Sequence, residues 1–138
     1  MWKKFDLAST DETTDGISIR VVRVQGYLDS STFTQLQDHL EKIIGEGQYR
    51  IIVEFGDLSY ISSAGLGVLL GMLQEVRDKN GDLKLANMSP KIRNLFDMLG
   101  FSRLIRIYDD QEAAKQAFRE DLAKSTQPGE ETNLEDNY

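Results

Sequence analysis

The sequence contains no cysteine and only one histidine, His39. Without cysteine the chain has no disulfide framework, no thiol nucleophile and no thiolate ligand for a metal, and one histidine cannot form a two-imidazole metal centre. These absences exclude most classes of metalloenzyme. We therefore expect no metal site, and we also expect no catalytic residue and no cofactor in the chain itself.

Long apolar runs are also absent. No run approaches the roughly 20 residues with which a helix crosses a bilayer. Residues 1–16 have two lysines but lack the apolar stretch of a secretory signal. The sequence thus predicts a cytoplasmic protein with no membrane partner. With 138 residues, of which 40% are hydrophobic, the chain is long enough for one globular domain with tails.

Basic residues are scarce at both ends of the chain. The formal net charge is −7, yet residues 17–119 contain 13 basic and 13 acidic residues and are neutral. Residues 1–16 contribute −2 and residues 120–138 contribute −5. A neutral body with an acidic tail argues against a nucleic acid or anionic lipid as partner, because these attract basic patches. We predict a single domain over residues 1–120 and an acidic, disordered tail over residues 121–138.

Hydrophobic periodicity predicts strands that alternate with helices. Alternating β-branched residues predict a strand over residues 17–24, followed by a turn at Gln25–Gly26 and paired with a hairpin partner near residues 5–7. Further strands are predicted over residues 49–55, 83–86 and 103–108. Amphipathic helices are predicted from residue 33 to Gly45 or Gly47, over residues 63–76 and 90–99, and from residue 109 onward. Because strands alternating with helices form parallel sheets through right-handed crossovers, the sequence predicts an α/β fold with a mainly parallel sheet.

The segment YISSAGLGVLLG, residues 60–71, places two serines before three glycines and an apolar run. The pattern predicts a loop that leads into a helix, with Ser62 as the N-cap and Ser63 as the first helical residue. For Gly65, Gly67 and Gly71 we predict close packing of this helix on the sheet.

Two enzymatic interpretations of this segment fit poorly. A dinucleotide fingerprint needs glycines directly after a strand and an acidic residue about 20 positions later. Here nine residues separate Phe55 from Gly65, and residues 85–87 are Leu-Ala-Asn. A hydrolase nucleophile elbow needs a glycine where Ile61 stands. His39 lies on another predicted helix and is expected to be a surface or boundary residue rather than a base.

The exposed hydroxyl predicted for Ser63 is compatible with a different chemistry. A phosphate there would add roughly −1.5 to −2 charges at the positive end of the helix dipole, where the fold tolerates an anion. The same charge would change any interface that docks on this helix end. The residues alone therefore allow a phosphorylation switch, although a serine in a first helical turn also needs no functional reason.

Three blocks of the sequence resemble one family in their order and spacing: VQGYLDSST (24–32), DLSYISSAGLGVLLG (57–71) and ANMSPKIRNLFDMLGF (86–101). From about residue 17 to residue 108 the chain resembles the bacterial anti-sigma-factor antagonists, single-domain members of the sulphate transporter and anti-sigma factor antagonist (STAS) family. The resemblance implies a STAS-type α/β fold: a small, mostly parallel sheet with one antiparallel edge pair, backed by about four helices.

The resemblance also implies a function. In that family the serine two positions before the glycine that opens Gly-Leu-Gly is phosphorylated by a serine kinase-type anti-sigma factor, and by position this serine is Ser63. The unphosphorylated form binds this partner and so releases the sigma factor, and a PP2C-type phosphatase restores it. ATP and metal would belong to those partners. The implied docking edge consists of Asp29, Ser62, Ser63, Ala64, Gly65, Leu66 and Gly67.

One position departs from the family's pattern. Aspartate is common just before the phosphoserine, whereas this chain has Ser62. Either residue caps a helix, so the fold is not affected, but Ser62 becomes an alternative phosphate acceptor and kinase recognition can differ. The alternative function is that of a STAS scaffold or transport-accessory module that works without phosphorylation.

Overall fold

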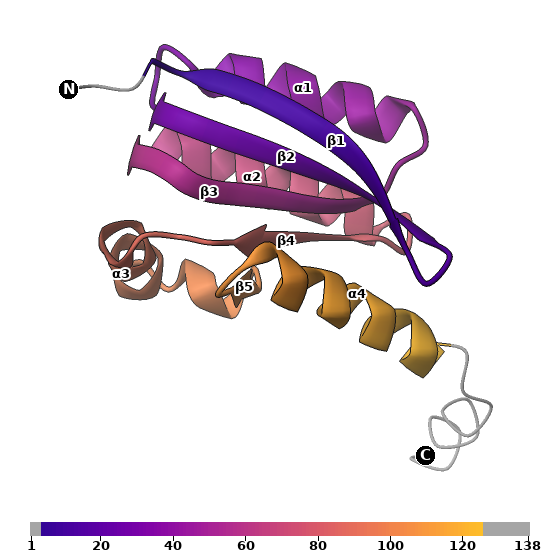
Figure 1. Ribbon diagram of the computed structural model, residues 1–138. Coiled ribbons are helices and arrows are strands. Elements are labelled where there is room, and N and C mark those ends of the chain that lie inside the picture. The colour runs from indigo at the N-terminus through magenta and orange to yellow at the C-terminus, as the bar shows by residue number, and fades with distance from the viewer. Residues whose placement is uncertain (1–3, 126–138) are drawn as a thin grey trace, which may run out of the picture.

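The strands form one five-stranded sheet in the order β1-β2-β3-β4-β5 in the computed structural model, which describes residues 4–125 (Figure 1). β1 and β2 are antiparallel, and the other neighbours are parallel. The strands are β1 (Asp6–Thr14), β2 (Ile17–Leu28), β3 (Arg50–Ile61), β4 (Asp82–Ala86) and β5 (Ile107–Tyr108). The helices are α1 (Phe33–Gly45), α2 (Ser63–Arg77), α3 (Pro90–Met98) and α4 (Gln111–Ser125), with a 3₁₀ turn η1 (Phe101–Arg103). The predicted α/β fold, with its antiparallel edge pair and four helices, is confirmed.

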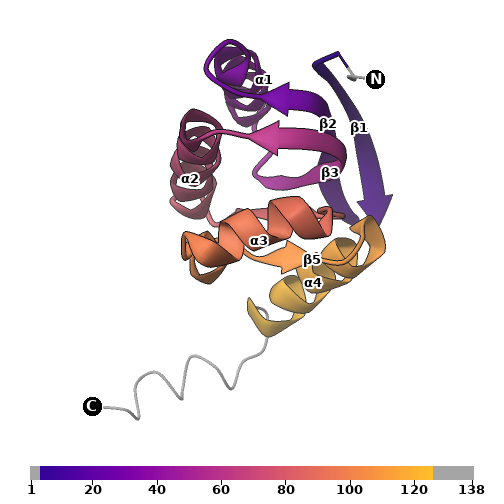
Figure 2. The ribbon, with the colours of Figure 1, turned by 90° about the vertical axis from the view of Figure 1, so that its left-hand side faces the viewer.

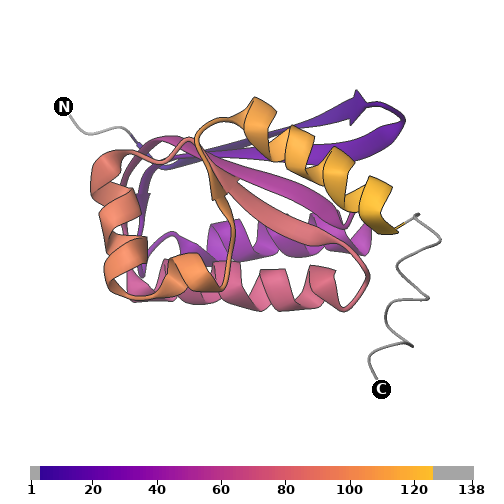
Figure 3. The same ribbon diagram turned by 90° about the horizontal axis from the view of Figure 1, so that it is seen from below.

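Helices cover both faces of the sheet (Figures 2 and 3). α1 and α2 lie against one face and, with residues of α3, enclose the larger hydrophobic core, which includes Leu36, Phe55 and Leu69. α4 lies over the opposite face on a smaller cluster made of Ile17, Ile19, Val21, Ile52, Ala86, Ala114 and Phe118. Cover on both faces explains why residues 51–53 form a continuous apolar run rather than an alternating one.

A buried lysine joins α4 to the sheet. Lys84, on β4, has no exposed surface, and its Nζ donates to carboxylate oxygens of Asp82 and Asp121 at 2.8 Å each. The ammonium also lies 4.6 Å from the ring centroid of Phe118 and 5.8 Å from that of Tyr108. Burial acts to lower the pKa of Lys84, but the hydrogen bonds with Asp121 and Asp82 outweigh it, so that the pKa is raised and the lysine stays charged.

β2 and β3 are longer than the sequence predicts, and so is β1, which spans Asp6–Thr14 instead of residues 5–7. β2 continues through Gln25 and Gly26, the predicted turn, to Leu28. These two residues lie instead where the pairing with β3 is irregular, and Gly26 there adopts a φ of 85°. β3 continues to Ile61. The sequence predicts a loop after Phe55, because polar residues interrupt the apolar pattern there. As a result, β2 and β3 end side by side.

The C-terminal part of the domain also differs from the prediction. Of the strand predicted over residues 103–108, only Ile107 and Tyr108 pair with β4. α4 continues to Ser125, so residues 121–125, which the sequence analysis assigns to the tail, belong to the domain. The rest of the predicted tail lies outside the described residues. Within residues 4–125, no helix is long and apolar enough to cross a membrane.

Candidate functional site

The candidate site lies at the edge of the sheet where the arrowheads of β2 and β3 end (Figure 1). The backbone N–H of Ser62 donates to the carbonyl oxygen of Leu28 over 2.8 Å. This bond holds the beginning of α2 against residues 29–32, the loop that leads from β2 into α1. The segments that contain Asp29 and Ser62–Ser63 are thereby neighbours, as the implied docking edge requires.

The two serines have different environments. Ser62 is the N-cap of α2, and its hydroxyl accepts a hydrogen bond from the N–H of Gly65 at 3.4 Å. Ser63 is the first residue of the helix and is exposed. Its hydroxyl has no hydrogen-bond partner among residues 4–125. Both helical positions agree with the sequence prediction, and the free hydroxyl of Ser63 stands where the helix dipole favours a negative charge.

The three glycines of the segment do not share one role. A Cβ added to Gly65 would lie 2.8 Å from Cγ of Leu28 and 3.2 Å from Cγ1 of Ile61, which confirms close packing for this residue. At Gly67 and Gly71 an added Cβ would meet nothing within 4 Å, because both lie on the exposed side of α2. The prediction of close packing is wrong for these two glycines.

The implied docking edge is only partly accessible. Leu66 is 4% exposed and belongs to the core, and Gly65 lies beneath the side chain of Leu28. Ala64 is half-buried, while Gly67 is exposed. Asp29 and Ser62 are half-buried as well, so of the seven residues only Gly65 and Leu66 are buried.

A groove that the sequence analysis did not predict adjoins this edge. It has a volume of about 250 Å³ and lies between α1 and α2. No charged residue lines it; its walls are Phe33, Gln37, Ala64, Gly67, Val68, Gly71 and Met72. The missing side chains of Gly67 and Gly71 leave this space open. Two glycines four positions apart inside an apolar helix were the signal that could have revealed it.

The loop beside Ser62 is held in place by its own side chains. Oδ1 of Asp29 accepts hydrogen bonds from the hydroxyl of Ser31 at 2.7 Å and from the backbone N–H of Ser31 at 2.9 Å. The hydroxyl of Thr32 donates to the carbonyl oxygen of Tyr27 at 2.7 Å and accepts from the N–H of Asp29 at 2.9 Å. The two hydrogen bonds from Ser31 lower the pKa of Asp29, and the bond from its hydroxyl has the larger effect. The carboxylate is therefore ionised at neutral pH. The loop thus carries a fixed negative charge.

Neither enzymatic interpretation gains support from the structure. The extension of β3 to Ile61 shortens the gap between strand and glycines, but Gly67 and Gly71 lie within α2 and not in a phosphate-binding loop. His39 is half-buried on α1, which agrees with the predicted boundary position, and its Nε2 has no partner in the described part of the chain. Burial and, after it, the charge of Arg20 lower the pKa of His39. Residues 4–125 contain no group of three His, Asp or Glu side chains that could hold a metal ion.

The chain is similar to known proteins over most of its length. A model of the STAS domain matches residues 9–114. The protein BtrV of Bordetella bronchiseptica, named as an anti-sigma factor antagonist, is 33% identical over 115 residues, which cover 83% of this chain and 97% of the relative.

Solved structures give the same result. The phosphorylated form of the Bacillus cell-fate determinant SpoIIAA superimposes with a TM-score of 0.59 at 28% identity, covering 80% of this chain and 99% of that protein. An anti-sigma factor antagonist from Mycobacterium paratuberculosis superimposes with a TM-score of 0.70 at 19% identity, covering 83% of this chain and 95% of that protein. The second likeness concerns the fold alone.

Proposed function

The chain belongs to the STAS domain family, and on this basis we propose that it is an anti-sigma-factor antagonist whose docking is switched off by phosphate on Ser63. Proteins similar to it are named as antagonists of anti-sigma factors, which makes them regulators. In the proposed cycle, the unphosphorylated protein binds a serine kinase-type anti-sigma factor in the cytoplasm and so frees the sigma factor. The kinase then phosphorylates Ser63, and a PP2C-type phosphatase reverses the modification.

The position of Ser63 carries this proposal. Its hydroxyl is exposed and unpaired at the first position of α2, so a kinase can reach it without unfolding the helix. Ser62 is the less suitable acceptor because its hydroxyl caps the helix, and phosphorylation there would replace the bond to Gly65. ATP and any metal ion belong to the kinase and the phosphatase in this scheme.

Electrostatics explains how phosphate would weaken docking while leaving the fold intact. The N–H groups at the beginning of α2 and the helix dipole stabilise an anion at Ser63 within this chain. For a partner, however, the same phosphate is roughly two negative charges that must lose their hydration when the interface forms. The ionised Asp29 in the adjoining loop adds a further negative charge to the modified edge. Docking of an uncharged or acidic partner surface is thus opposed.

Phosphate mapping tests the residue assignment. The protein would be incubated with a serine kinase-type anti-sigma factor, ATP and Mg²⁺, and the phosphorylated position read by mass spectrometry in wild type, Ser63→Ala and Ser62→Ala. We expect phosphate on Ser63 in the wild type and in Ser62→Ala, and none in Ser63→Ala. Phosphate on Ser62 would show that the acceptor is wrong, and no phosphate with several such kinases would favour the scaffold that works without phosphorylation.

A further inference from the structure

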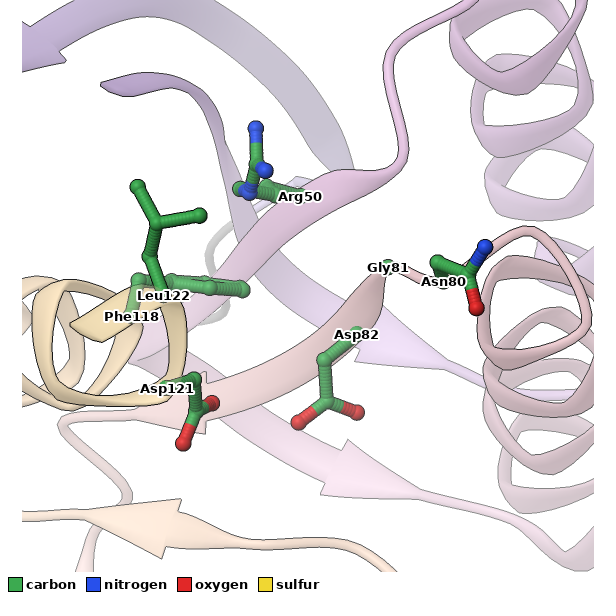
Figure 4. A pocket seen from close by; sticks show the side chains of 7 residues that line it. All are labelled: Arg50, Asn80, Gly81, Asp82, Phe118, Asp121 and Leu122. Atoms are coloured by element: carbon green, nitrogen blue, oxygen red, sulfur yellow. The ribbon is translucent and has the colours of Figure 1, made fainter. Parts of the chain in front are cut away.

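Two adjoining pockets that have Arg50 in common lie at the edge of the sheet opposite Ser63. The first has a volume of about 120 Å³ and is drawn in Figure 4. The second, of about 170 Å³, adjoins it. Arg50, Asn80 and Gly81 line both, and Lys79 lines the second. In Figure 4 the side chains of Arg50 and Leu122 lie on one side of the first pocket, and the carboxylates of Asp82 and Asp121 lie on the other.

Arg50 and Lys79, which together line the second pocket and are called the basic wall below, carry positive charges that no ion pair neutralises within residues 4–125. The guanidinium of Arg50 has no hydrogen bond or ion pair within residues 4–125. Lys79 lies over the ring of Tyr49, 5.3 Å from its centroid, and has no carboxylate partner in the same part of the chain.

The nearby carboxylates already have partners. Asp82 accepts from Arg77 at 3.0 Å and from Lys84 at 2.8 Å, and Asp121 accepts from Lys84 at 2.8 Å. These acids are therefore not free to neutralise Arg50 or Lys79. The wall retains two positive charges that an acidic ligand could neutralise.

The chain itself supplies an acidic segment at this place. α4 ends at Ser125, and Leu122 in its last turn lines the first pocket. Residues 126–138 follow, with four acidic residues (Glu130, Glu131, Glu135 and Asp136) and no basic one. Glu130 stands five residues after Ser125, where α4 ends, and five residues span up to about 17 Å when extended. The first acidic pair can therefore reach Arg50 and Lys79, and Pro128–Gly129 is a pair that favours a change of chain direction.

We propose that the acidic segment 126–138 docks on the wall formed by Arg50 and Lys79 in the same molecule. Its carboxylates neutralise the two cations and cover the pocket beside the Lys84–Asp121 ion pair. The C-terminal helix thereby gains a second attachment to the sheet.

This docking goes beyond the proposed function and does not depend on it. Arg50 begins β3 and Ser63 follows its end, so that the 11 steps of this 12-residue strand separate the two edges by roughly 36 Å. The acidic segment therefore leaves the Ser63 edge open to a partner.

A spin label tests the contact directly, because the cysteine-free chain can be labelled at a single introduced cysteine. In the full-length variant Asn133→Cys, the label should strongly broaden the amide NMR signals of Asn80 and Gly81 and leave that of Ser63 sharp. Raising the salt to about 1 M should remove most of the broadening, since the Debye length falls to about 3 Å. Arg50→Gln with Lys79→Gln should reduce it at least twofold at low salt.

Two controls make the result decisive. Lys91→Gln with Arg103→Gln changes the net charge equally at exposed basic residues outside the wall and should leave the broadening unchanged. A mixture of labelled protein without ¹⁵N and unlabelled protein with ¹⁵N should show no broadening. Broadening in that mixture would mean that the segment docks between copies, which would overturn the proposal. The proposal would also be overturned if the Arg50/Lys79 variant showed the same broadening as the labelled parent protein, or if no sample showed broadening.

Discussion

A Cβ at Gly65 would lie 2.8 Å from Cγ of Leu28, so these two residues determine how closely α2 approaches the end of β2. Gly65→Ala should therefore lower the free energy of unfolding by about 1–3 kcal/mol, because Leu28 is fully buried and has little room to move. Gly67→Ala and Gly71→Ala are matched controls on the open side of the same helix. Each should raise the free energy of unfolding by about 0.5–1 kcal/mol. Urea unfolding of the three variants measures this contrast. A change of the unfolding free energy in the same direction for all three would refute the different roles of the glycines.

Lys84 should tolerate an apolar replacement better than the loss of a counterion. Lys84→Met keeps the buried stem of the side chain. Asp82 then still has Arg77 as a partner, and Asp121 is in contact with water. We therefore expect the free energy of unfolding to change by less than about 1 kcal/mol. Asp121→Ala leaves the buried ammonium with Asp82 alone and should cost about 1–3 kcal/mol.

The exposed neighbour Glu120 provides the control for this pair, since Glu120→Ala removes the same charge from α4 without touching Lys84. Thermal and urea unfolding would be compared across the three variants. If Lys84→Met lost more stability than Asp121→Ala, the ion pair, rather than the packing of the buried side chain, would be what stabilises α4.

His39 should make the protein less stable as the pH falls below neutrality. Its pKa is lowered in the folded state, by burial first and by Arg20 next, so the unfolded chain binds more protons at mildly acidic pH. The contribution of His39 to stability is therefore complete above its unfolded pKa of about 6.5 and is lost as the pH falls toward the folded value. It is the chain's one histidine, so unfolding would be measured between about pH 7 and pH 5, where an imidazole titrates and most carboxylates stay ionised. His39→Gln should make the free energy of unfolding less dependent on pH. If the curves of the variant and the wild type were parallel, the pH dependence would come from other groups.

Asp29 should increase the effect of phosphate on Ser63. In the unmodified protein its carboxylate is held by Ser31, and an amide oxygen in Asp29→Asn can accept the same hydrogen bonds without the charge. We expect the ratio of partner affinities, unphosphorylated to phosphorylated, to fall about twofold or more in Asp29→Asn. The four affinities form a double-mutant cycle. Asp38→Asn, an exposed acid on α1, is the control, and an unchanged ratio in Asp29→Asn would exclude Asp29 from the switch.

Local patterns in the sequence predict most of the fold, and contacts between distant segments account for what they miss. Alternating apolar residues identify β2 and the beginning of β3, but their continuation to Leu28 and Ile61 depends on pairing across irregular positions that polar residues occupy. Lys84 could not be predicted as buried, because its partner Asp121 lies 37 positions away. The continuation of α4 to Ser125 could not be predicted either, since Asp121 in its last turns is held by this contact.

In the candidate site, too, local features can be predicted from the sequence and contacts between distant segments cannot. Ser62 and Ser63 are predictable because capping is a local property of one helix end. The different roles of Gly65, Gly67 and Gly71 are not, since they depend on what lies opposite each glycine. The groove between α1 and α2 likewise requires both helices to be in place.

The affinity of the phosphorylated and unphosphorylated forms for the same kinase-type anti-sigma factor is the most direct test of the switch. Both forms of the wild type would be titrated calorimetrically with a non-hydrolysable ATP analogue present, so that phosphorylation state stays fixed. Phosphate on Ser63 should weaken binding at least about tenfold, which corresponds to about 1.4 kcal/mol, with the thermal stability of the free protein unchanged or raised. Equal affinities of the two forms would contradict the proposed function.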